Sequence, residues 1–250
     1  MPSHVGLRPL KSWRYVGVYG DELMLCVASV RIGPVRQSFW AVWDRLGRAL
    51  AERTVLGRGA VRLAPGRVKV SDPSVEIDLV LEESPGIEAV NPSGSSYAWT
   101  RKQGGIRACG TVSLQGRRRS LAARAVVDDT AGYYERHTHW RWSAGVGTSD
   151  DGRELAWNLV DGVNDPAVGS ERAVWIAGVA HEPPPSRFAP DLSAVDELVF
   201  HAEAVRERHE NRLLLRSAYR QPFGTFTGQL PGGLAVSEGY GVMEEHDVYW

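Results

Sequence analysis

The chain has 250 residues, of which 43% are hydrophobic and 24% are charged, and its formal net charge is −1. These values are typical of an ordinary globular protein and exclude the fibrous and disordered classes. A net charge so close to zero supplies no electrostatic field for nucleic acid, so we expect no nucleic-acid partner.

The first twenty residues lack an apolar core of signal-peptide length, and no window approaches the ~18 consecutive apolar residues that span a bilayer. We therefore expect a cytoplasmic protein with no membrane span. Cys26 and Cys109 lie far apart in apolar segments, which indicates buried free thiols. Motifs for nucleotides and for common metal centres do not occur, and we expect no cofactor.

Short apolar runs separated by glycine and proline indicate an antiparallel β protein. Glycine and proline together number 41 (27 plus 14), which leaves no room for long helices. The expected strands include residues 15–19, 23–28, 74–81 and 155–160. Alternation of apolar and polar side chains is clearest in the third of these runs.

Two segments contain residues that would also suit a helix, and we interpret both as hairpins. Residues 39–53 begin with an aromatic run and continue into a turn-forming segment. Residues 198–219 alternate apolar with polar positions, and we expect their turn at 208–211, before a strand at 212–215. The three consecutive prolines at 183–185 predict a loop. No linker composition marks a boundary, and we place the division into two domains, 1–127 and 128–250, near residues 125–129.

Residues 128–142 are the densest part of the chain in reactive and aromatic side chains. A strand at residues 137–142 would alternate its side chains between two faces. One face would carry Arg136, Thr138, Trp140 and Trp142. The other would carry Glu135, His137, His139 and Arg141. The first face is typical of the wall of an apolar cavity with a few polar groups, or of a buried aromatic core.

Asp128 and Asp129 are adjacent, so they face opposite sides of an extended chain and cannot form a carboxylate dyad. Burial among aromatic rings would raise the pKa of the inward carboxyl and suit a general acid, whereas pairing with Arg136 would lower that pKa. Three roles remain open: a catalytic acid, an ion pair that orients a ligand, and a structural ion pair. In each case we expect Arg136 to contact one of the two aspartates.

The spacing of His137 and His139 is compatible with metal ligation, and Glu244 and His246 form a second pair of suitable type. The face shared by the two histidines also carries Glu135 and Arg141, which is typical of a solvated surface. We therefore predict no metal site.

Seven short motifs, in order along nearly the whole chain, resemble a bacterial family defined by the domain of unknown function 2804. They are WTRKQ at 99–103, DDTAGY at 128–133, RxTxWxWSAG at 136–145, WNLV at 157–160, SER at 170–172, QPFG at 221–224 and GVMExH at 241–246. More distantly, such proteins resemble a two-barrel, lipocalin-like group. That group includes carotenoid hydratases of the hydroxyneurosporene synthase type, tocopherol cyclases and fungal pericyclases.

This resemblance implies an all-β fold of two consecutive lipocalin-like antiparallel β-barrels or half-barrels packed together. We expect a Trp- and Tyr-lined cavity in the second half, which would bind an isoprenoid- or lipid-like molecule. The candidate catalytic residues are Asp129, Asp128 and Arg136. The candidate ligand-binding residues are Tyr133, Thr138, Trp140, Trp142, Trp157, Asn158, Glu171, Phe223, Glu244 and His246.

Three functions are compatible with such a protein. The first is a cofactor-independent hydratase, isomerase or cyclase with an aspartic acid as proton donor. The second is a lipid carrier or sensor with no chemistry. The third is a protein whose barrels are filled by side chains and which acts through its surface. A titrating carboxyl inside the cavity would favour the first, and ionisable groups saturated in ion pairs would favour the second.

Overall fold

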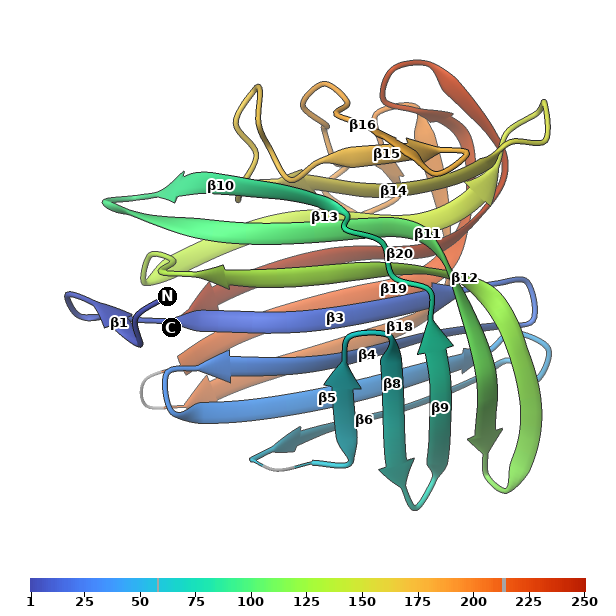
Figure 1. The fold of residues 1–250 in the computed structure, drawn as a ribbon, viewed down its shortest axis with the longest axis horizontal. Helices are drawn as coiled ribbons and strands as arrows, with labels where there is room; N and C mark the ends of the chain where they lie inside the picture. Colours follow the sequence, from blue (N-terminus) through green and yellow to red (C-terminus); the bar gives the residue numbers. More distant parts are fainter. Residues whose placement is uncertain (58, 213–214) are drawn as a thin grey trace.

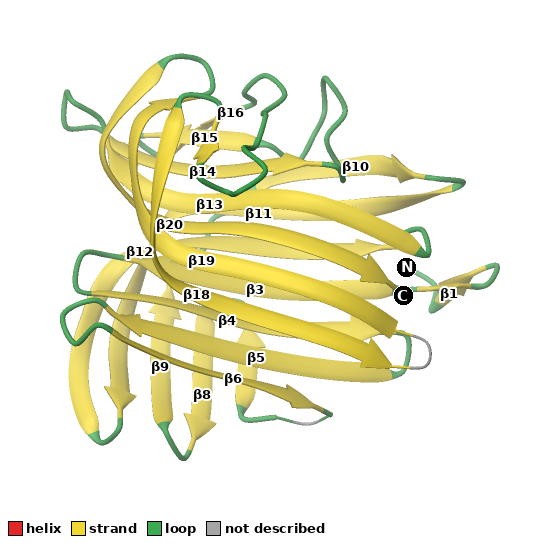
Figure 2. Cartoon of the chain, turned by 180° about the vertical axis from the view of Figure 1, so that it is seen from behind, coloured by secondary structure: helices red, strands yellow, loops and turns green. Residues whose placement is uncertain are grey.

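The computed structural model describes residues 1–57, 59–212 and 215–250 (Figure 1). Within these ranges the chain forms strands, turns and loops, and no helix (Figure 2). The all-β prediction is confirmed, as are the strands expected at residues 15–19, 23–28, 74–81 and 155–160. Nothing in the described part of the chain is a helix long and apolar enough to cross a membrane.

The first large sheet is antiparallel and takes its strands from the first half of the chain. Its spatial order is β6-β5-β4-β3-β12-β11-β9-β8-β7, and β10 also pairs with β11. The strands are β3 (Lys11–Tyr19), β4 (Leu23–Ile32), β5 (Val35–Asp44), β6 (Ala49–Leu56), β7 (Val61–Ala64), β8 (Arg67–Asp72), β9 (Val75–Leu81), β10 (Ile87–Ser93), β11 (Ser96–Leu114) and β12 (Arg117–Gly132). A short hairpin of β1 (His4–Val5) and β2 (Arg8–Pro9) precedes them.

The second large sheet is also antiparallel and has the order β16-β15-β14-β13-β20-β19-β18-β17. Its strands are β13 (His137–Thr148), β14 (Glu154–Asp161), β15 (Ala173–Ile176), β16 (Val179–His181), β17 (Ala194–Val195), β18 (Leu198–Arg212), β19 (Leu215–Leu230) and β20 (Leu234–Tyr249). The long strands β18, β19 and β20 lie behind β3 and β4 in Figure 1 and in front of them in Figure 2. The two sheets therefore form two stacked layers.

The chain passes from the first sheet to the second through residues 133–136. Strand β12 runs without interruption to Gly132, so the change of sheet lies after this residue and not at the expected position between 127 and 128. The physical reason is that β12 is paired on both edges up to its last residue, with β11 over its whole length and with β3 over residues 124–132. The division into two domains stays a prediction.

Among the described residues, apolar side chains form three buried clusters, because both faces of several strands are covered. One cluster, with Leu25 and Ile77, lies inside the curl of the first sheet, where β7 comes into contact with β4. A second, with Trp157 and Phe226, lies on the second sheet under the segment 188–195. A third cluster packs the two sheets against each other. Its members include Tyr15, Met24, Trp43, Val126, Trp142, Trp175 and Phe223.

Both predicted hairpins exist. Residues 39–53 fall in β5 and β6, which pair antiparallel from Gln37 to Leu56. For residues 198–219, the turn predicted at 208–211 is wrong, because these residues continue β18 and pair with β19. The strand expected at 212–215 falls partly on Leu213 and Leu214, which lie outside the described residues. The prolines at 183–185 lie in a loop, as expected. Cys26 is buried, but Cys109 is exposed, contrary to prediction, because it lies on the outward face of β11.

A β-bulge at Gly105 bends the long strand β11. The pairing with β12 skips this residue, since Gly104 pairs with Val126 and Ile106 with Ala125. Residues before the bulge pair with β10 and residues from Ala108 onward pair with β9. The backbone of Gly105 has φ +73°, in the left-handed region that favours glycine.

Replacing Gly105 by alanine should lower the free energy of unfolding by about 1–2 kcal/mol, because a side chain at this φ is strained. The new Cβ would meet Ala156 Cβ at an ordinary 3.5 Å, so the loss would come from the backbone. Urea denaturation measures it, with Gly20→Ala as control, since Gly20 lies outside the left-handed region and its Cβ would meet nothing closer than 3.7 Å. An equal loss in the two variants would contradict this explanation of the bend.

Candidate functional site

A pocket of about 150 Å³ lies between the two sheets. Its lining residues come from β3, β4, β5 and β12 of the first sheet, from β13, β14, β18, β19 and β20 of the second, and from the connecting segments. The cavity expected inside the second half is therefore wrongly placed. The cluster around Trp157 and Phe226 fills the space on that side of the second sheet. A volume of this size is comparable to a cavity that accommodates one benzene ring.

Aromatic rings form much of the pocket wall. Trp13 stacks between two of them, with ring centroids 5.5 Å from Tyr134 and 6.4 Å from Trp140. Tyr15 meets Trp142 edge to face, with centroids 5.2 Å apart, and so joins the two sheets beneath the pocket. Trp140 and Trp142 project from the same face of β13, as the alternation predicted. Apolar walls with few polar groups are the usual composition of a small-molecule site.

A buried ion cluster lies at one end of this wall. The ammonium group of Lys102, which is only 1% exposed, lies 2.6 Å from Asp128 Oδ1 and 3.3 Å from Glu171 Oε1. Thr130 Oγ1 and Trp13 Nε1 also donate hydrogen bonds to Asp128, at 2.8 and 3.3 Å. Asp128 is therefore an acceptor saturated by donors. An ammonium removed from water requires such partners, since an unpaired buried charge costs several kcal/mol.

Glu171 belongs to both the ion cluster and the pocket wall. Asn164 Nδ2 donates to Glu171 Oε2 at 2.9 Å, and the same nitrogen lies 2.9 Å from the hydroxyl of Tyr134. Burial raises the pKa of Glu171 from 4.5 to about 7, against the opposing effect of Lys102. Near neutral pH this carboxyl thus changes its charge easily. It was among the predicted ligand-binding residues.

A second buried carboxyl, Glu244, faces the pocket from β20 and is held by neutral groups. Trp140 Nε1 donates to Oε1 at 3.0 Å, while Tyr219 Oη and Gln221 Nε2 donate to Oε2, each at 2.9 Å. Among the described residues Glu244 makes no ion pair. Burial raises the pKa of this carboxyl, although its hydrogen bonds and the charge of Arg206 act in the opposite direction. Glu244 is therefore the pocket carboxyl that combines a raised pKa with the absence of an ion pair in the described structure.

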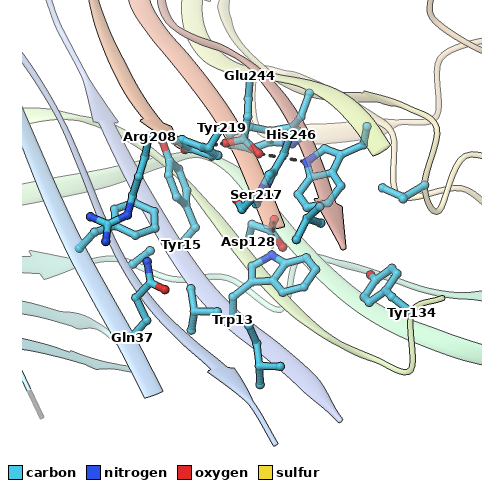
Figure 3. Close-up of a pocket in the computed structure, with 18 of the residues that line it drawn as sticks. Trp13, Tyr15, Gln37, Asp128, Tyr134, Arg208, Ser217, Tyr219, Glu244 and His246 are labelled. Carbon is cyan, nitrogen blue, oxygen red and sulfur yellow. Dashed lines mark hydrogen bonds between the residues drawn. The ribbon is translucent and has the colours of Figure 1, made fainter. Parts of the chain in front are cut away.

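His246 lies beside Glu244 on β20, as the upper part of Figure 3 shows. Its Nε2 forms a 2.7 Å hydrogen bond with Ser217 Oγ, and its ring contacts those of Trp140 and Tyr219. Burial and the neighbouring Arg206 lower the pKa of His246 to about 3. The imidazole is consequently neutral at physiological pH and offers hydrogen bonds without charge.

The prediction that Arg136 contacts one of the two aspartates is wrong. Arg136 is exposed and, within the described ranges, pairs with neither aspartate. Asp129 is instead held by Arg14 at 2.7 Å and by Arg101 at 2.7 Å, on the face of β12 opposite to Asp128. These arginines project from β3 and β11, directly opposite Asp129 in the register, whereas Arg136 precedes β13. The prediction that the two aspartates face opposite sides is confirmed.

Of the predicted site residues, Asp128, Trp140, Trp142, Glu171, Glu244 and His246 line the pocket. Asp129, Arg136 and the other five predicted ligand-binding residues do not. Tyr133 donates to the backbone oxygen of Pro2, and its neighbour Tyr134 lines the pocket instead. Trp157 and Phe223 are buried in apolar clusters.

Thr138 and Asn158 support pocket residues rather than line the pocket. Thr138 Oγ1 accepts a 3.0 Å hydrogen bond from the indole of Trp250, which is part of the wall. Asn158 accepts from Trp142 Nε1 at 2.8 Å and donates to the backbone oxygen of Glu171 at 2.9 Å. It thereby fixes two pocket residues relative to each other.

His137 and His139 lie on the exposed face of β13, the side expected to be solvated. They contact Asp247 at 2.8 Å and Glu245 at 3.2 Å on the neighbouring strand. The described part of the chain holds no group of three or more histidine, cysteine, aspartate or glutamate side chains arranged for a metal ion.

Sequence reasoning missed the pocket residues Trp13, Tyr219 and Arg206, and also Lys102, which pairs with the pocket residues Asp128 and Glu171. A signal existed for Lys102, which is one of only three lysines and lies in the WTRKQ motif. Because nearly all other basic residues are arginines, this lysine could have been predicted to be a buried counter-ion for one of the acids in the other motifs. Trp13, Tyr219 and Arg206 come from strands whose position depends on long-range pairing, and no local pattern marks them.

Comparison with known proteins gives a family and a fold. The family model described as domain of unknown function (DUF2804) matches residues 58–250. An AttH-like protein from Nitrosomonas europaea is 14% identical, with a TM-score of 0.54 over 94% of this chain and 91% of that one. Kievitone hydratase from Nectria haematococca is 9% identical, with a TM-score of 0.54 over 94% and 88%.

The structure of CghA with Sch210972 is 8% identical, with a TM-score of 0.51 over 96% of this chain and 88% of that one. At such identities the likeness shows a shared fold. A search among curated proteins finds no significant match in sequence. The expected resemblance to the lipocalin-like group of hydratases and pericyclases is confirmed at the level of architecture.

The raised pKa of Glu171 predicts a pH-dependent stability. Between pH 4.5 and about 7 the folded protein binds a proton that the unfolded chain has released, so the contribution of this carboxyl is complete below pH 4.5 and is lost as the pH rises through about 7. Glu171→Gln cannot titrate. Its stability relative to the wild type should therefore improve by up to about 3 kcal/mol from pH 4.5 to 7.5. Urea denaturation at both pH values measures this change, and a constant difference would contradict the assignment.

Proposed function

We propose that this chain, which belongs to the DUF2804 family, binds a hydrophobic small molecule between its two sheets and transfers a proton to or from it through Glu244. The ligand class is the apolar, isoprenoid- or lipid-like one expected from the sequence, of which the pocket would enclose a part about the size of one ring. The reaction class is hydration, isomerisation or cyclisation without a cofactor. The proposed acid is Glu244 and neither of the two aspartates. This choice rests on the hydrogen-bond partners of Glu244, which are all neutral groups.

The observation that carries the proposal is a buried pocket carboxyl held by neutral groups alone. Asp128 accepts an ion pair and two further hydrogen bonds, which favours its acceptor role as part of the framework. Glu244 has no such counter-ion in the described structure, and burial raises its pKa. A general acid needs a proton that it can release near the working pH, and a raised carboxyl pKa supplies this property.

Tyr219 gives Glu244 a way to exchange its proton with a ligand. Its hydroxyl lies 2.9 Å from Glu244 Oε2, and both residues line the pocket (Figure 3). A hydroxyl can donate or accept, so a protonated Glu244 can donate to Tyr219 while the tyrosine proton turns toward the ligand. The ionised form of Glu244 can then receive a proton by the reverse path.

The reaction balances within the ligand, water and Glu244. The proton that Tyr219 passes to the ligand forms a new C–H bond with the electron pair of an alkene, which leaves a cationic carbon, and the proton of Glu244 replaces it on the tyrosine. Attack of water, loss of a neighbouring proton, or attack by a second alkene completes hydration, isomerisation or cyclisation. Each route finally returns one proton to Glu244. The aromatic rings that line the pocket, Trp142 among them, favour positive charge in the pocket.

A carrier or sensor is the second candidate, and one observation favours it. The aspartates first predicted as acids are both saturated in ion pairs, as expected of a framework without chemistry. The filled-barrel alternative receives partial support, because side chains fill the curl of the first sheet and one side of the second. The pocket between the sheets nevertheless offers room for a ligand.

Solvent deuterium can distinguish these functions. The purified protein is incubated in D2O with a lipophilic extract of its host, and the extract is compared by mass spectrometry before and after incubation. We expect the wild type to introduce deuterium into at least one compound, because each proposed route exchanges a proton through Glu244. Glu244→Gln should lose at least about 100-fold of this activity, within the usual contribution of a general acid.

The matched control is Glu245→Gln, which changes the neighbouring carboxyl that contacts Arg141 and His139 away from the pocket. This variant should retain the wild-type rate. Retention of a compound by the protein without deuterium uptake would instead support the carrier. Equal deuterium uptake with Glu244→Gln would contradict the role of Glu244.

A further inference from the structure

Arg206 presents an unsatisfied donor in the described structure of the pocket. Arg206 is 3% exposed and lines the pocket, and its Nη1 is buried with no hydrogen-bond partner among the described residues. The other two nitrogens are occupied, since Nε lies 2.9 Å from Glu52 Oε2 and Nη2 donates to Thr54 Oγ1 at 3.0 Å. Buried polar atoms normally have partners, so a buried donor at a ligand site is expected to bind an acceptor.

The position of the guanidinium group is fixed by aromatic rings. The central carbon of Arg206 lies 4.0 Å from the ring centroid of Phe39 and 4.8 Å from that of Tyr219. Phe39 belongs to β5 of the first sheet and Tyr219 to β19 of the second, and both line the pocket. The donor is thus held where the two sheets meet, next to the tyrosine that contacts Glu244.

The charges around the pocket favour a neutral acceptor over an anion. Glu52 already balances Arg206, and Arg208 is paired with Glu210. Asp128, the carboxylate that faces the pocket from the first sheet, is likewise balanced by Lys102. A ligand carboxylate would therefore add an unpaired charge to the pocket, whereas a carbonyl oxygen would accept the free N–H without adding charge.

We propose that Arg206 Nη1 binds a carbonyl oxygen of a neutral, otherwise apolar ligand. This inference rests on the proposed function, since it specifies the class of molecule that the same pocket takes. It assigns Arg206 to ligand orientation and leaves proton transfer to Glu244. The ligand would then carry its carbonyl close to Tyr219, at the meeting of the two sheets.

Three single-ring probes of similar size test the proposal: acetophenone, which has a carbonyl; ethylbenzene, which has none; and benzoate, which is an anion. Binding to the whole protein is measured by calorimetry or by tryptophan fluorescence. The wild type should bind acetophenone about tenfold more tightly than either of the others. Arg206→Met should remove this preference over ethylbenzene, because it deletes the charged donor while the apolar stem remains.

Arg45→Met is the matched control. Arg45 also pairs with a glutamate, Glu203, and lies over a tyrosine ring, that of Tyr240, but it is outside the pocket lining. Its replacement should leave the preference unchanged. If the wild type binds ethylbenzene as tightly as acetophenone, or if Arg206→Met weakens both equally, Arg206 is a structural residue and the inference is wrong.

Glu52→Gln gives an independent measurement should Arg206→Met fail to fold. Removing the counter-charge of Arg206 should increase benzoate affinity relative to acetophenone by about tenfold. An unchanged ratio in the folded variant would overturn the inference. So would tighter binding of benzoate than of acetophenone by the wild type. Failure of all three probes to bind the wild type would instead contradict the proposed binding function itself, and the inference with it.

Discussion

The ammonium group of Lys102 between Asp128 and Glu171 is the interaction on which the arrangement of the pocket depends. Lys102 and Asp128 are paired across β11 and β12 of the first sheet, whereas Glu171 lies between β14 and β15 of the second. The cluster therefore fastens one sheet to the other beside the pocket. Its groups are removed from water, so the loss of Lys102 would leave two buried carboxyls without a counter-ion. This requirement holds the two sheets in one alignment.

In this alignment the two sheets present carboxyls with different surroundings to the pocket. On the first sheet, Asp128 is neutralised by the cluster and positions Trp13 through a hydrogen bond. On the second sheet, Glu244 receives only neutral donors, so its burial is not offset by a direct counter-ion in the described structure. Environment rather than residue type thus distinguishes a structural acid from a reactive one. Arg206 adds a donor near Glu244 for which the ligand is the proposed partner.

Much of the fold and part of the site could be predicted from local patterns. Alternation in residues 137–142 correctly separated Trp140 and Trp142 from the solvated histidines, and adjacency correctly separated Asp128 from Asp129. The partners of these aspartates could not be predicted, because Lys102 and Arg14 reach them through pairing between distant strands. Trp157 was misplaced for another reason. Both faces of β14 are buried, so burial alone does not identify the face that meets the pocket.

Glu244 should hold a proton more firmly than an ordinary glutamate, because it is buried in the pocket wall. Carboxyl-carbon NMR of protein labelled with ¹³C-glutamate measures this directly, with the Glu244 signal assigned by its loss in Glu244→Gln. We expect a titration midpoint above the usual 4.5, caused by burial, and a shift of the same signal when acetophenone is added. A midpoint at or below 4.5, or a Glu244 signal that does not shift with any pocket ligand, would contradict this role of Glu244.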